Sequence, residues 1–380
     1  MNSESKPSPA GENSRRKFFQ QVGTLAAASS VAARAGAAQQ QPPPGAAEPG
    51  RGGRGGRGGR GFGFSQPVPG PLSKEPMPTV KFGKYDVSRL IIGSNVPAGL
   101  SHLTRMLDVE IRAWNTPERL TQQFKRCEEL GINCMEDGMG RIPPYNRENN
   151  GKLLFATRNT APKDESIRPG RGAKEIAQGG CIAIHHGGAG DTGTDAWWRQ
   201  GKLDRVREWC KAVRDAGVLV AVTSHRPEVF DIIESQNWDV DYYMCCMYKY
   251  GRTKAEWEKA FASNPGMAPA EVDTWSNGPS TQYYGDGSLF VRGDPPEMLK
   301  IVKQTRKPCW VYKILAGGRL CESPQIVEAT FKHIFESIKP TDAVVVGMWD
   351  KQLDEFAINK EYVIKYGGTS INNTGTPTSA

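Results

Sequence analysis

The sequence predicts a (β/α)8 TIM barrel, and three observations lead to this fold class. From residue 79 onward, short apolar runs alternate with amphipathic helical patterns, which is typical of βα units around a parallel sheet. The apolar runs number eight, whereas a doubly wound sheet more often has about five to seven strands. The turn after the first run, Ser94-Asn95-Val96-Pro97, also lacks the glycines of a phosphate-binding turn.

The predicted strands do not alternate strictly between apolar and polar residues, so we expect both of their faces to be buried. They cover residues 90–93, 132–136, 153–157, 181–185, 218–223, 242–246, 309–314 and 343–347. The helices between them carry apolar residues at spacings of three and four, which gives each a stripe that can pack on the sheet. The expected helices include 117–130, 203–216, 227–235, 297–305, 324–337 and 351–359.

Two loops interrupt this alternation. Residues 251–294 form a long insertion between strands six and seven, and loops of that length on a barrel usually cover the active-site face. Residues 188–193 match the pattern G-x-G-x-x-G, but they follow the fourth strand and no helix follows them directly. We interpret them as a flexible loop and not as a dinucleotide fingerprint.

The N-terminus resembles a twin-arginine export signal. Ser14-Arg15-Arg16-Lys17-Phe18-Phe19 precedes an Ala-rich apolar stretch, and small-x-small cleavage sites follow near residue 37. This apolar stretch is too short to span a bilayer, so we expect residues 1–38 to be removed and the mature chain to contain no transmembrane segment. The expected partner is the twin-arginine translocase, and the expected location is the periplasm or the extracellular space. A basic N-terminus that happens to precede small residues is the alternative.

The segment 39–75 is predicted to be a disordered spacer, because it is rich in Gly, Arg and Pro. Its Arg-Gly-Gly repeats at 51–64 could instead contact nucleic acid or an anionic envelope surface. The formal net charge is +8, but residues 1–73 hold nine Lys and Arg against three Glu. The remainder is therefore near neutral, and we expect no specific nucleic-acid partner. The barrel is expected over 76–366, and 367–380 reads as a disordered tail without an anchor.

The eight cysteines form no CxxC pair. Most of them fall inside predicted strands or helices, where cysteine usually acts as a small buried apolar residue. An exported protein could form disulfides, but a domain of this size does not require them. We expect mostly free, buried thiols.

Several segments resemble the aldo/keto reductases, in the order in which that family presents them. Residues 80–93, including Gly83-Lys84-Tyr85-Asp86, resemble the opening phrase that closes the barrel bottom. Residues 131–137 resemble the second strand, which ends in a catalytic aspartate. Residues 182–185 are similar to the fourth strand and its catalytic histidine, while 217–227 and 347–359 resemble later strands of the family. The resemblance runs from about residue 79 to 360 and implies the barrel fold.

The resemblance also implies a catalytic set of Asp, Tyr, Lys and His with NADP(H) as the cofactor. His185 matches the family histidine. Glu136, or Asp137 after a one-residue slip, stands at the aspartate position. Arg158 replaces the lysine, and the nearest tyrosine is Tyr145. Because arginine does not deprotonate and binds carboxylate or phosphate in a bidentate manner, this set differs from a working reductase.

Chemistry in such barrels is performed at the C-terminal ends of the strands. The polar residues at these ends are the candidates for catalysis and substrate binding, although any one of them could serve only as a loop or capping residue. Our catalytic candidates are His185, Glu136, Asp137, Arg158, Tyr145 and Lys313. Our substrate-binding candidates are Asn95, His186, His225, Tyr248 and Trp349.

Three arrangements of these residues remain open. His185 with Glu136 or Asp137 and Tyr145 could transfer protons. His185, His225 and Glu136 could bind a divalent metal. Lys313 could form a Schiff base with a carbonyl substrate, although a lysine at a strand end more often points outward.

These observations predict an exported enzyme that acts on a small polar carbonyl compound or a carbohydrate. A redox-neutral reaction of the isomerase, lyase or hydrolase type is our first expectation. An NAD(P)H-dependent reductase and a non-catalytic ligand-binding barrel are the alternatives.

Overall fold

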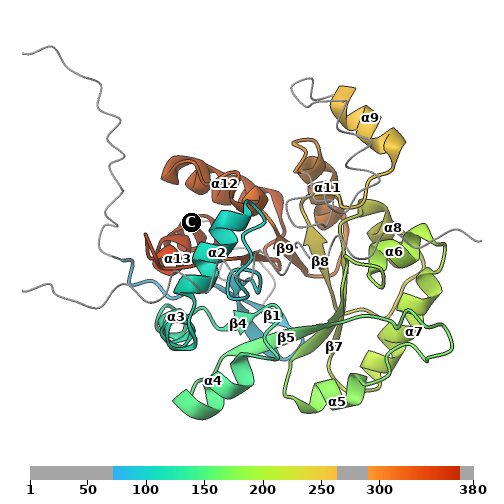
Figure 1. The fold of residues 1–380 in the computed structure, drawn as a ribbon, viewed down its shortest axis with the longest axis horizontal. Helices are drawn as coiled ribbons and strands as arrows, with labels where there is room; N and C mark the ends of the chain where they lie inside the picture. The colour runs from blue at the N-terminus through green and yellow to red at the C-terminus, as the bar shows by residue number, and fades with distance from the viewer. Residues whose placement is uncertain (1–71, 263–289, 369–380) are drawn as a thin grey trace, which may run out of the picture. The chain divides into compact units, whose positions relative to one another are not determined.

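The computed structural model describes residues 72–262 and 290–368, all within the unit Ser65–Ala380. Eight parallel strands close into a barrel in the order β10-β3-β4-β5-β6-β7-β8-β9, and helices surround it (Figure 1). The predicted fold class is therefore confirmed. The strands are β3 (Leu90–Ile92), β4 (Cys134–Met135), β5 (Leu154–Asn159), β6 (Ala183–His186), β7 (Leu219–Ser224), β8 (Tyr242–Cys246), β9 (Cys309–Tyr312) and β10 (Ala343–Val346).

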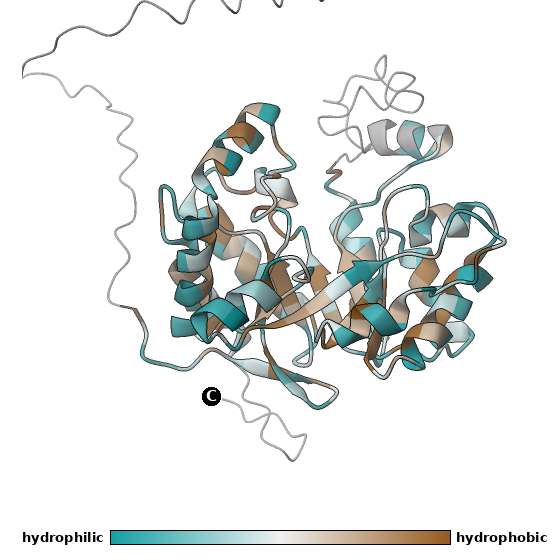
Figure 2. Ribbon diagram, turned by 60° about the horizontal axis from the view of Figure 1, so that its bottom comes forward, coloured by the Kyte–Doolittle hydropathy of each residue, from teal (hydrophilic) through white to brown (hydrophobic). Residues whose placement is uncertain are grey.

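Each barrel strand overlaps one of the eight segments expected from the sequence, and β8 coincides with its segment. Every residue of β6, β8 and β10 is buried. Both faces of these strands are thus covered, as the lack of alternation predicted. In Figure 2 the barrel strands are mostly brown, whereas the surrounding helices mix brown and teal. The core consequently includes the barrel interior and the layer between the strands and the helices.

The helices follow the expected positions with one clear shift. The segment 351–359 was expected to be helical, but α13 begins at Glu355 and extends to Gly367. The Asp354 side chain accepts a hydrogen bond from the backbone N–H of Ala357, and this N-cap fixes the start of the helix. The helices are α2 (Arg105–Trp114), α3 (Pro117–Glu129), α4 (Ile142–Asn149), α5 (Ala173–Gln178), α6 (Thr194–Arg199), α7 (Leu203–Arg214), α8 (Pro227–Ser235), α9 (Lys254–Ala262), α11 (Asp294–Gln304), α12 (Pro324–Ser337) and the short 3-10 helix η3 (Ala316–Gly318).

An antiparallel hairpin closes the N-terminal end of the barrel. It consists of β1 (Thr79–Phe82) and β2 (Tyr85–Ser88), joined by a turn in which Gly83 has a φ of +57°. The Phe82 ring packs edge-on against Tyr242 and Trp310, with ring centroids 5.3 and 5.4 Å apart. The segment 80–93 therefore includes the hairpin that closes the N-terminal end of the barrel, as the resemblance implied.

Seven of the eight cysteines are buried, which confirms the expectation for them; Cys321 is exposed, and all eight carry free thiols. The export signal, the Arg-Gly-Gly repeats, residues 263–289 of the insertion and residues 369–380 of the tail lie outside the described residues. Within the described ranges, no helix has both the length and the apolar character that crossing a membrane requires.

Candidate functional site

A cavity of about 1050 Å³ lies at the C-terminal ends of the barrel strands. This is the end at which barrel enzymes perform their chemistry. Most of the side chains selected from the sequence line it: Asn95, Glu136, Arg158, His185, His225, Lys313 and Trp349.

Glu136 and His185 both line this cavity and contact each other. The His185 Nε2 atom lies 3.6 Å from Glu136 Oε1 and 3.3 Å from the Glu136 carbonyl oxygen. The other carboxylate oxygen, Oε2, accepts a hydrogen bond of 2.6 Å from the hydroxyl of Ser94. His185 Nδ1 lies 3.1 Å from Thr223 Oγ1, so both ring nitrogens have partners. These contacts fix the carboxylate and the imidazole side by side.

The charge state of His185 follows from its burial. Burial lowers the pKa of this imidazole, and the negative charges of Glu136 and Asp137 offset only part of that effect. The ring is therefore neutral at pH 7, with one nitrogen that donates and one that accepts. A neutral imidazole beside a carboxylate can pass a proton between substrate atoms.

Arg158 adds a positive charge next to this pair. It is the register partner of His185 in the parallel pair β5–β6, so both side chains project from neighbouring positions. Asp137 accepts a hydrogen bond of 3.1 Å from the backbone N–H of Arg158, and its Oδ2 lies 3.7 Å from Arg158 Nε. The Arg158 side chain is 63% exposed and can bind an anionic or carbonyl oxygen. Asp137 orients this arginine and is not itself among the cavity-lining residues.

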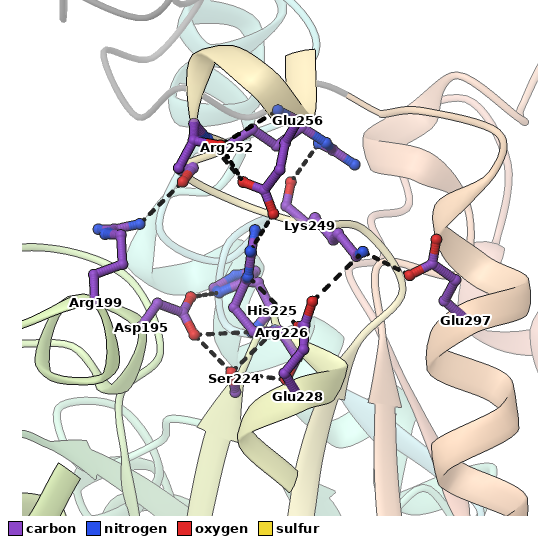
Figure 3. A network of polar contacts seen from close by, with 12 residues as sticks. Asp195, Arg199, Ser224, His225, Arg226, Glu228, Lys249, Arg252, Glu256 and Glu297 are labelled. Carbon is purple, nitrogen blue, oxygen red and sulfur yellow. Dashed lines mark hydrogen bonds and ion pairs between the residues drawn. The ribbon is translucent and has the colours of Figure 1, made fainter. Parts of the chain in front are cut away.

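A second polar cluster lies at the end of β7 (Figure 3). Asp195 Oδ2 lies 2.7 Å from His225 Nδ1, and Asp195 Oδ1 accepts a hydrogen bond of 2.6 Å from Ser224. On its other side, His225 Nε2 lies 3.1 Å from the hydroxyl oxygen of Tyr312. Both His225 and Tyr312 line the cavity, whereas Asp195 is buried behind them.

His225 is positively charged at neutral pH, unlike His185. Burial alone would lower the pKa of His225, but the neighbouring Cys246 and Asp195 groups outweigh burial and raise it to about 9. The two cavity histidines thus have opposite charge states for a physical reason. A pair of groups whose pKa values are pushed apart is typical of acid–base sites.

The loop after β6 brings Asp195 to His225. The backbone is compressed at Gly193, because a Cβ atom there would lie 2.2 Å from the carbonyl oxygen of Gly188. Helix α6 begins directly afterwards at Thr194, which corrects the expectation that no helix follows this segment directly, and Asp195 is its second residue. The G-x-G-x-x-G segment therefore serves to pack a short helix close to the barrel.

Four predicted site residues are not among the cavity-lining residues: Asp137, described above, and Tyr145, His186 and Tyr248. Tyr145 lies in α4, where its hydroxyl donates a 2.5 Å hydrogen bond to Glu128 Oε2 and its ring packs against Phe124. Proton transfer by His185 and Tyr145 together is therefore not supported by the structure. The reason is that the turn after β4 leads straight into α4, which carries Tyr145 away from the barrel mouth.

His186 and Tyr248 are also absent from the cavity-lining residues. His186 follows His185 on the strand, so its side chain projects to the opposite face. Its Nε2 accepts a 2.9 Å hydrogen bond from the backbone N–H of Ala161, and burial lowers its pKa to about 3. Tyr248 is 8% exposed and packs edge-on against Phe290 at 4.9 Å. Both side chains are buried in the core of this structure, and a role in substrate binding stays a prediction.

The predicted metal set is not formed. Within residues 72–262 and 290–368, no three His, Cys, Asp or Glu side chains group closely enough to hold a metal ion. His225 uses its nitrogens for Asp195 and Tyr312, and His185 and Glu136 contact each other instead. The described residues thus do not bring His185, His225 and Glu136 together as a metal-binding group, and metal binding by these residues stays a prediction.

The remaining predicted residues lie on the cavity wall. Lys313 follows β9 with a φ of +59°, a backbone region that non-glycine residues rarely adopt, and its Nζ lies 5.7 Å from the Phe290 ring centroid. Asn95 Nδ2 lies 2.9 Å from His102 Nε2. The backbone N–H of Trp349 donates to Glu355, a cavity carboxyl whose pKa burial raises to about 7.

Sequence analysis missed two members of the second cluster, Asp195 and Tyr312. Tyr312 directly precedes the selected Lys313, and the inward alternation Trp310–Tyr312 could have indicated it. Asp195 lies beyond the strand end, in the helix that follows the glycine-rich loop. No local spacing marks it, because its role depends on how closely that helix approaches β7.

Solved structures of TIM-barrel enzymes are similar to this chain in fold. A truncated 3-deoxy-D-arabino-heptulosonate 7-phosphate synthase from Thermotoga maritima has 12% identity and a TM-score of 0.41, covering 76% of this chain and 91% of its own. The N-acetylmannosamine-6-phosphate 2-epimerase from Clostridium perfringens has 12% identity and a TM-score of 0.36, covering 66% and 86%. The 3-hexulose-6-phosphate synthase from Salmonella typhimurium has 14% identity and a TM-score of 0.34, covering 62% and 88%.

No protein-family model matches the chain, and no curated protein sequence matches it significantly. The identities and TM-scores of the solved structures carry no argument about activity. The chain is thus assigned to the (β/α)8-barrel fold by its own closed, eight-stranded parallel barrel.

Proposed function

We propose that this protein is an exported barrel enzyme that catalyses a redox-neutral proton transfer on a small polar carbonyl compound or a sugar. The observation that carries the proposal is the Glu136–His185 pair, with 3.6 Å between Oε1 and Nε2 inside the cavity. A carboxylate removes a proton from the carbon next to a carbonyl group, and the neutral imidazole exchanges protons with the adjacent oxygen. Arg158 binds the carbonyl oxygen or an acidic group of the substrate.

Deuterium exchange tests this proposal without knowledge of the natural substrate. The purified protein is incubated in D2O with dihydroxyacetone, D-glyceraldehyde, D-xylose, D-glucose and D-fructose, and proton NMR follows exchange at the carbon next to the carbonyl group. We expect exchange in at least one compound and a loss of about 10²–10⁴-fold in Glu136→Gln and His185→Asn. Glu129→Gln, on the exposed side of α3, is the matched control. If none of the five compounds shows deuterium exchange, the proposal is contradicted.

An aldo/keto reductase activity is the second candidate. It is supported by Glu136 and His185 at the ends of the second and fourth barrel strands and by the hairpin that closes the barrel. The described residues do not suit that chemistry, because Tyr145 lies away from the cavity and Arg158 stands at the lysine position. NADPH oxidation with the same compounds, in the absence of deuterium exchange, would favour this candidate.

A non-catalytic barrel is the third candidate. It would bind one of these compounds without exchanging its protons, and Glu136→Gln would leave that binding intact.

Export by the twin-arginine route is part of the proposal and rests on Arg15 and Arg16. Replacement of both by lysine, followed by cell fractionation, should shift the protein from the periplasm to the cytoplasm. Lys6→Arg is the matched control, and a periplasmic double variant would contradict the proposal.

A further inference from the structure

Tyr312, His225 and Asp195 form a continuous chain of hydrogen bonds from the cavity wall into the core. The distances are 3.1 Å from the Tyr312 hydroxyl oxygen to His225 Nε2 and 2.7 Å from His225 Nδ1 to Asp195 Oδ2. Asp195 is 1% exposed and His225 is 5% exposed, whereas Tyr312 is only partly buried. The chain thus leads from a buried carboxylate to a hydroxyl group at the cavity.

The direction of these hydrogen bonds follows from the charge of His225. As an imidazolium ion it carries a proton on each nitrogen, so Nδ1–H donates to Asp195 and Nε2–H donates to the Tyr312 oxygen. Tyr312 therefore accepts from His225, and its own O–H can donate to the sulfur of Cys246, with which it also has a side-chain hydrogen bond, or to a molecule in the cavity that Tyr312 lines. Burial, followed by the nearby Cys246 and Asp195 charges, keeps the pKa of Tyr312 well above its usual value, so this hydroxyl retains its proton.

Two neighbours define where that hydroxyl can act. Cys246 is the register partner of Tyr312 in the pair β8–β9, but it is 1% exposed and is not among the cavity-lining residues. Glu136 and Tyr312 line the same cavity, Glu136 after β4 and Tyr312 at the end of β9. A molecule bound in this cavity can therefore contact both side chains.

We infer that Tyr312 is the proton donor to the substrate oxygen, and that His225 and Asp195 position it and restore its proton. This inference rests on the proposed function and names a second group for the same reaction. It also narrows the substrate class to compounds whose carbonyl oxygen becomes a hydroxyl in the intermediate, as in α-hydroxy aldehydes and ketones.

The step balances in protons and electrons. Glu136 takes the proton from the carbon, the C–H electron pair forms the C=C bond, and the carbonyl electron pair moves to oxygen. That oxygen takes the proton of Tyr312, and Tyr312 regains one from His225 Nε2. In the second half, Glu136 returns a proton to carbon, the enediol hydroxyl gives its proton to Tyr312 as the carbonyl group re-forms, and Tyr312 passes a proton to the neutral His225, so that all three residues regain their starting states. Nothing is oxidised or reduced overall.

The deuterium-exchange assay on the same five compounds tests this inference. Tyr312→Phe should lower the exchange rate by about 10²–10⁴-fold. Tyr242→Phe is the matched control: this tyrosine lies two residues before Met244 on the same barrel interior, and its hydroxyl has no hydrogen-bond partner in the described residues. Tyr242→Phe should retain the wild-type rate. Exchange that survives in Tyr312→Phe overturns the inference and leaves the proposed function standing.

A second variant separates proton donation from a structural role. Incorporation of 3-fluorotyrosine at position 312 lowers the pKa of the phenol while preserving its shape. The alkaline limb of the pH profile of the exchange rate should move to lower pH. If this limb stays at the same pH, the inference is overturned. If the wild type shows no exchange at all, the proposed function and the donor role fail together.

The positioning role of Asp195 has a readout that needs no substrate. Histidine NMR of the full mature chain, with His225 assigned from the His225→Gln spectrum, should show its pKa falling in Asp195→Asn toward the ordinary value. Tyr312→Phe should shift the Nε2 signal of His225. If neither change occurs, the hydrogen-bond chain is absent and the inference is overturned. Loss of exchange in Cys246→Ala, with exchange retained in Tyr312→Phe, would identify the thiol as the donor instead.

Discussion

Arg158 and His185 occupy register-paired positions on β5 and β6, and they differ sharply in exposure: the arginine side chain is 63% exposed and the histidine side chain 1%. The arginine can therefore be replaced with little effect on folding, whereas the histidine is enclosed by the barrel.

Arg158→Gln should weaken substrate binding more than it weakens the chemical step. A hydrogen bond to a charged group contributes about 1.5–3 kcal/mol, so KM should rise by about ten-fold or more. Initial exchange rates against substrate concentration measure this effect. Arg158→Lys should recover only part of it, because lysine lacks the planar fork. An unchanged KM in both variants would show that Arg158 does not contact the substrate.

The stability of the protein should decline on both sides of neutrality for separate reasons. His225 has a folded pKa of about 9, above the ordinary 6.5, so its contribution is fully present below pH 6.5 and is lost as the pH rises through 9. His186 has a folded pKa of about 3, so its contribution is present above pH 6.5 and is lost as the pH falls. Denaturant titrations across pH should show a flatter alkaline limb in His225→Gln and a flatter acid limb in His186→Gln. If the pH dependence of the unfolding free energy is the same in the variants as in the wild type, these pKa assignments are contradicted.

Asp195→Ala should destabilise the fold by about 3–5 kcal/mol, because it leaves the His225 charge buried without its partner. The control is Asp191→Ala, since Asp191 is exposed and pairs with Lys163 on the surface at 3.2 Å. That pair should contribute less than about 1 kcal/mol. Urea unfolding at pH 7 measures both, and equal effects would indicate that the Asp195–His225 contact is not buried in solution.

Gly193→Ala should disturb the second cluster without touching it directly. The added Cβ would lie 2.2 Å from the Gly188 carbonyl oxygen, so the loop and the start of α6 must shift. We expect a loss of about 1–3 kcal/mol in stability together with an altered His225 NMR signal. Gly140→Ala meets no atom within 4 Å and should be neutral. A Gly193→Ala protein with wild-type stability and spectrum would show that this loop is not held tightly.

The barrel strands were predictable because each is a compact apolar run. Residues 242–246 show this best, since Tyr242 and Met244 belong to the core cluster inside the barrel, while Tyr243 and Cys245 belong to the cluster that includes the helices. Placing Glu136, Arg158 and His185 at neighbouring strand ends required only the order of the strands, because parallel strands present their C-terminal ends at one rim.

The rest of the site depended on loop paths, which periodicity does not encode. Tyr145 was a candidate because it is the tyrosine nearest to the position that the reductase resemblance implies, yet α4 carries it outward to Glu128. Asp195 reaches His225 only because the backbone at Gly193 is packed against Gly188. His186 was counted with His185, although strand alternation alone separates their faces.

The hairpin of β1 and β2 also has a kinetic consequence. Because Phe82 packs against Tyr242 and Trp310, the barrel is closed at its N-terminal end. A molecule that binds in the cavity must consequently enter and leave at the C-terminal rim. If the proposed activity is correct, product has to leave through the opening that the next substrate molecule enters.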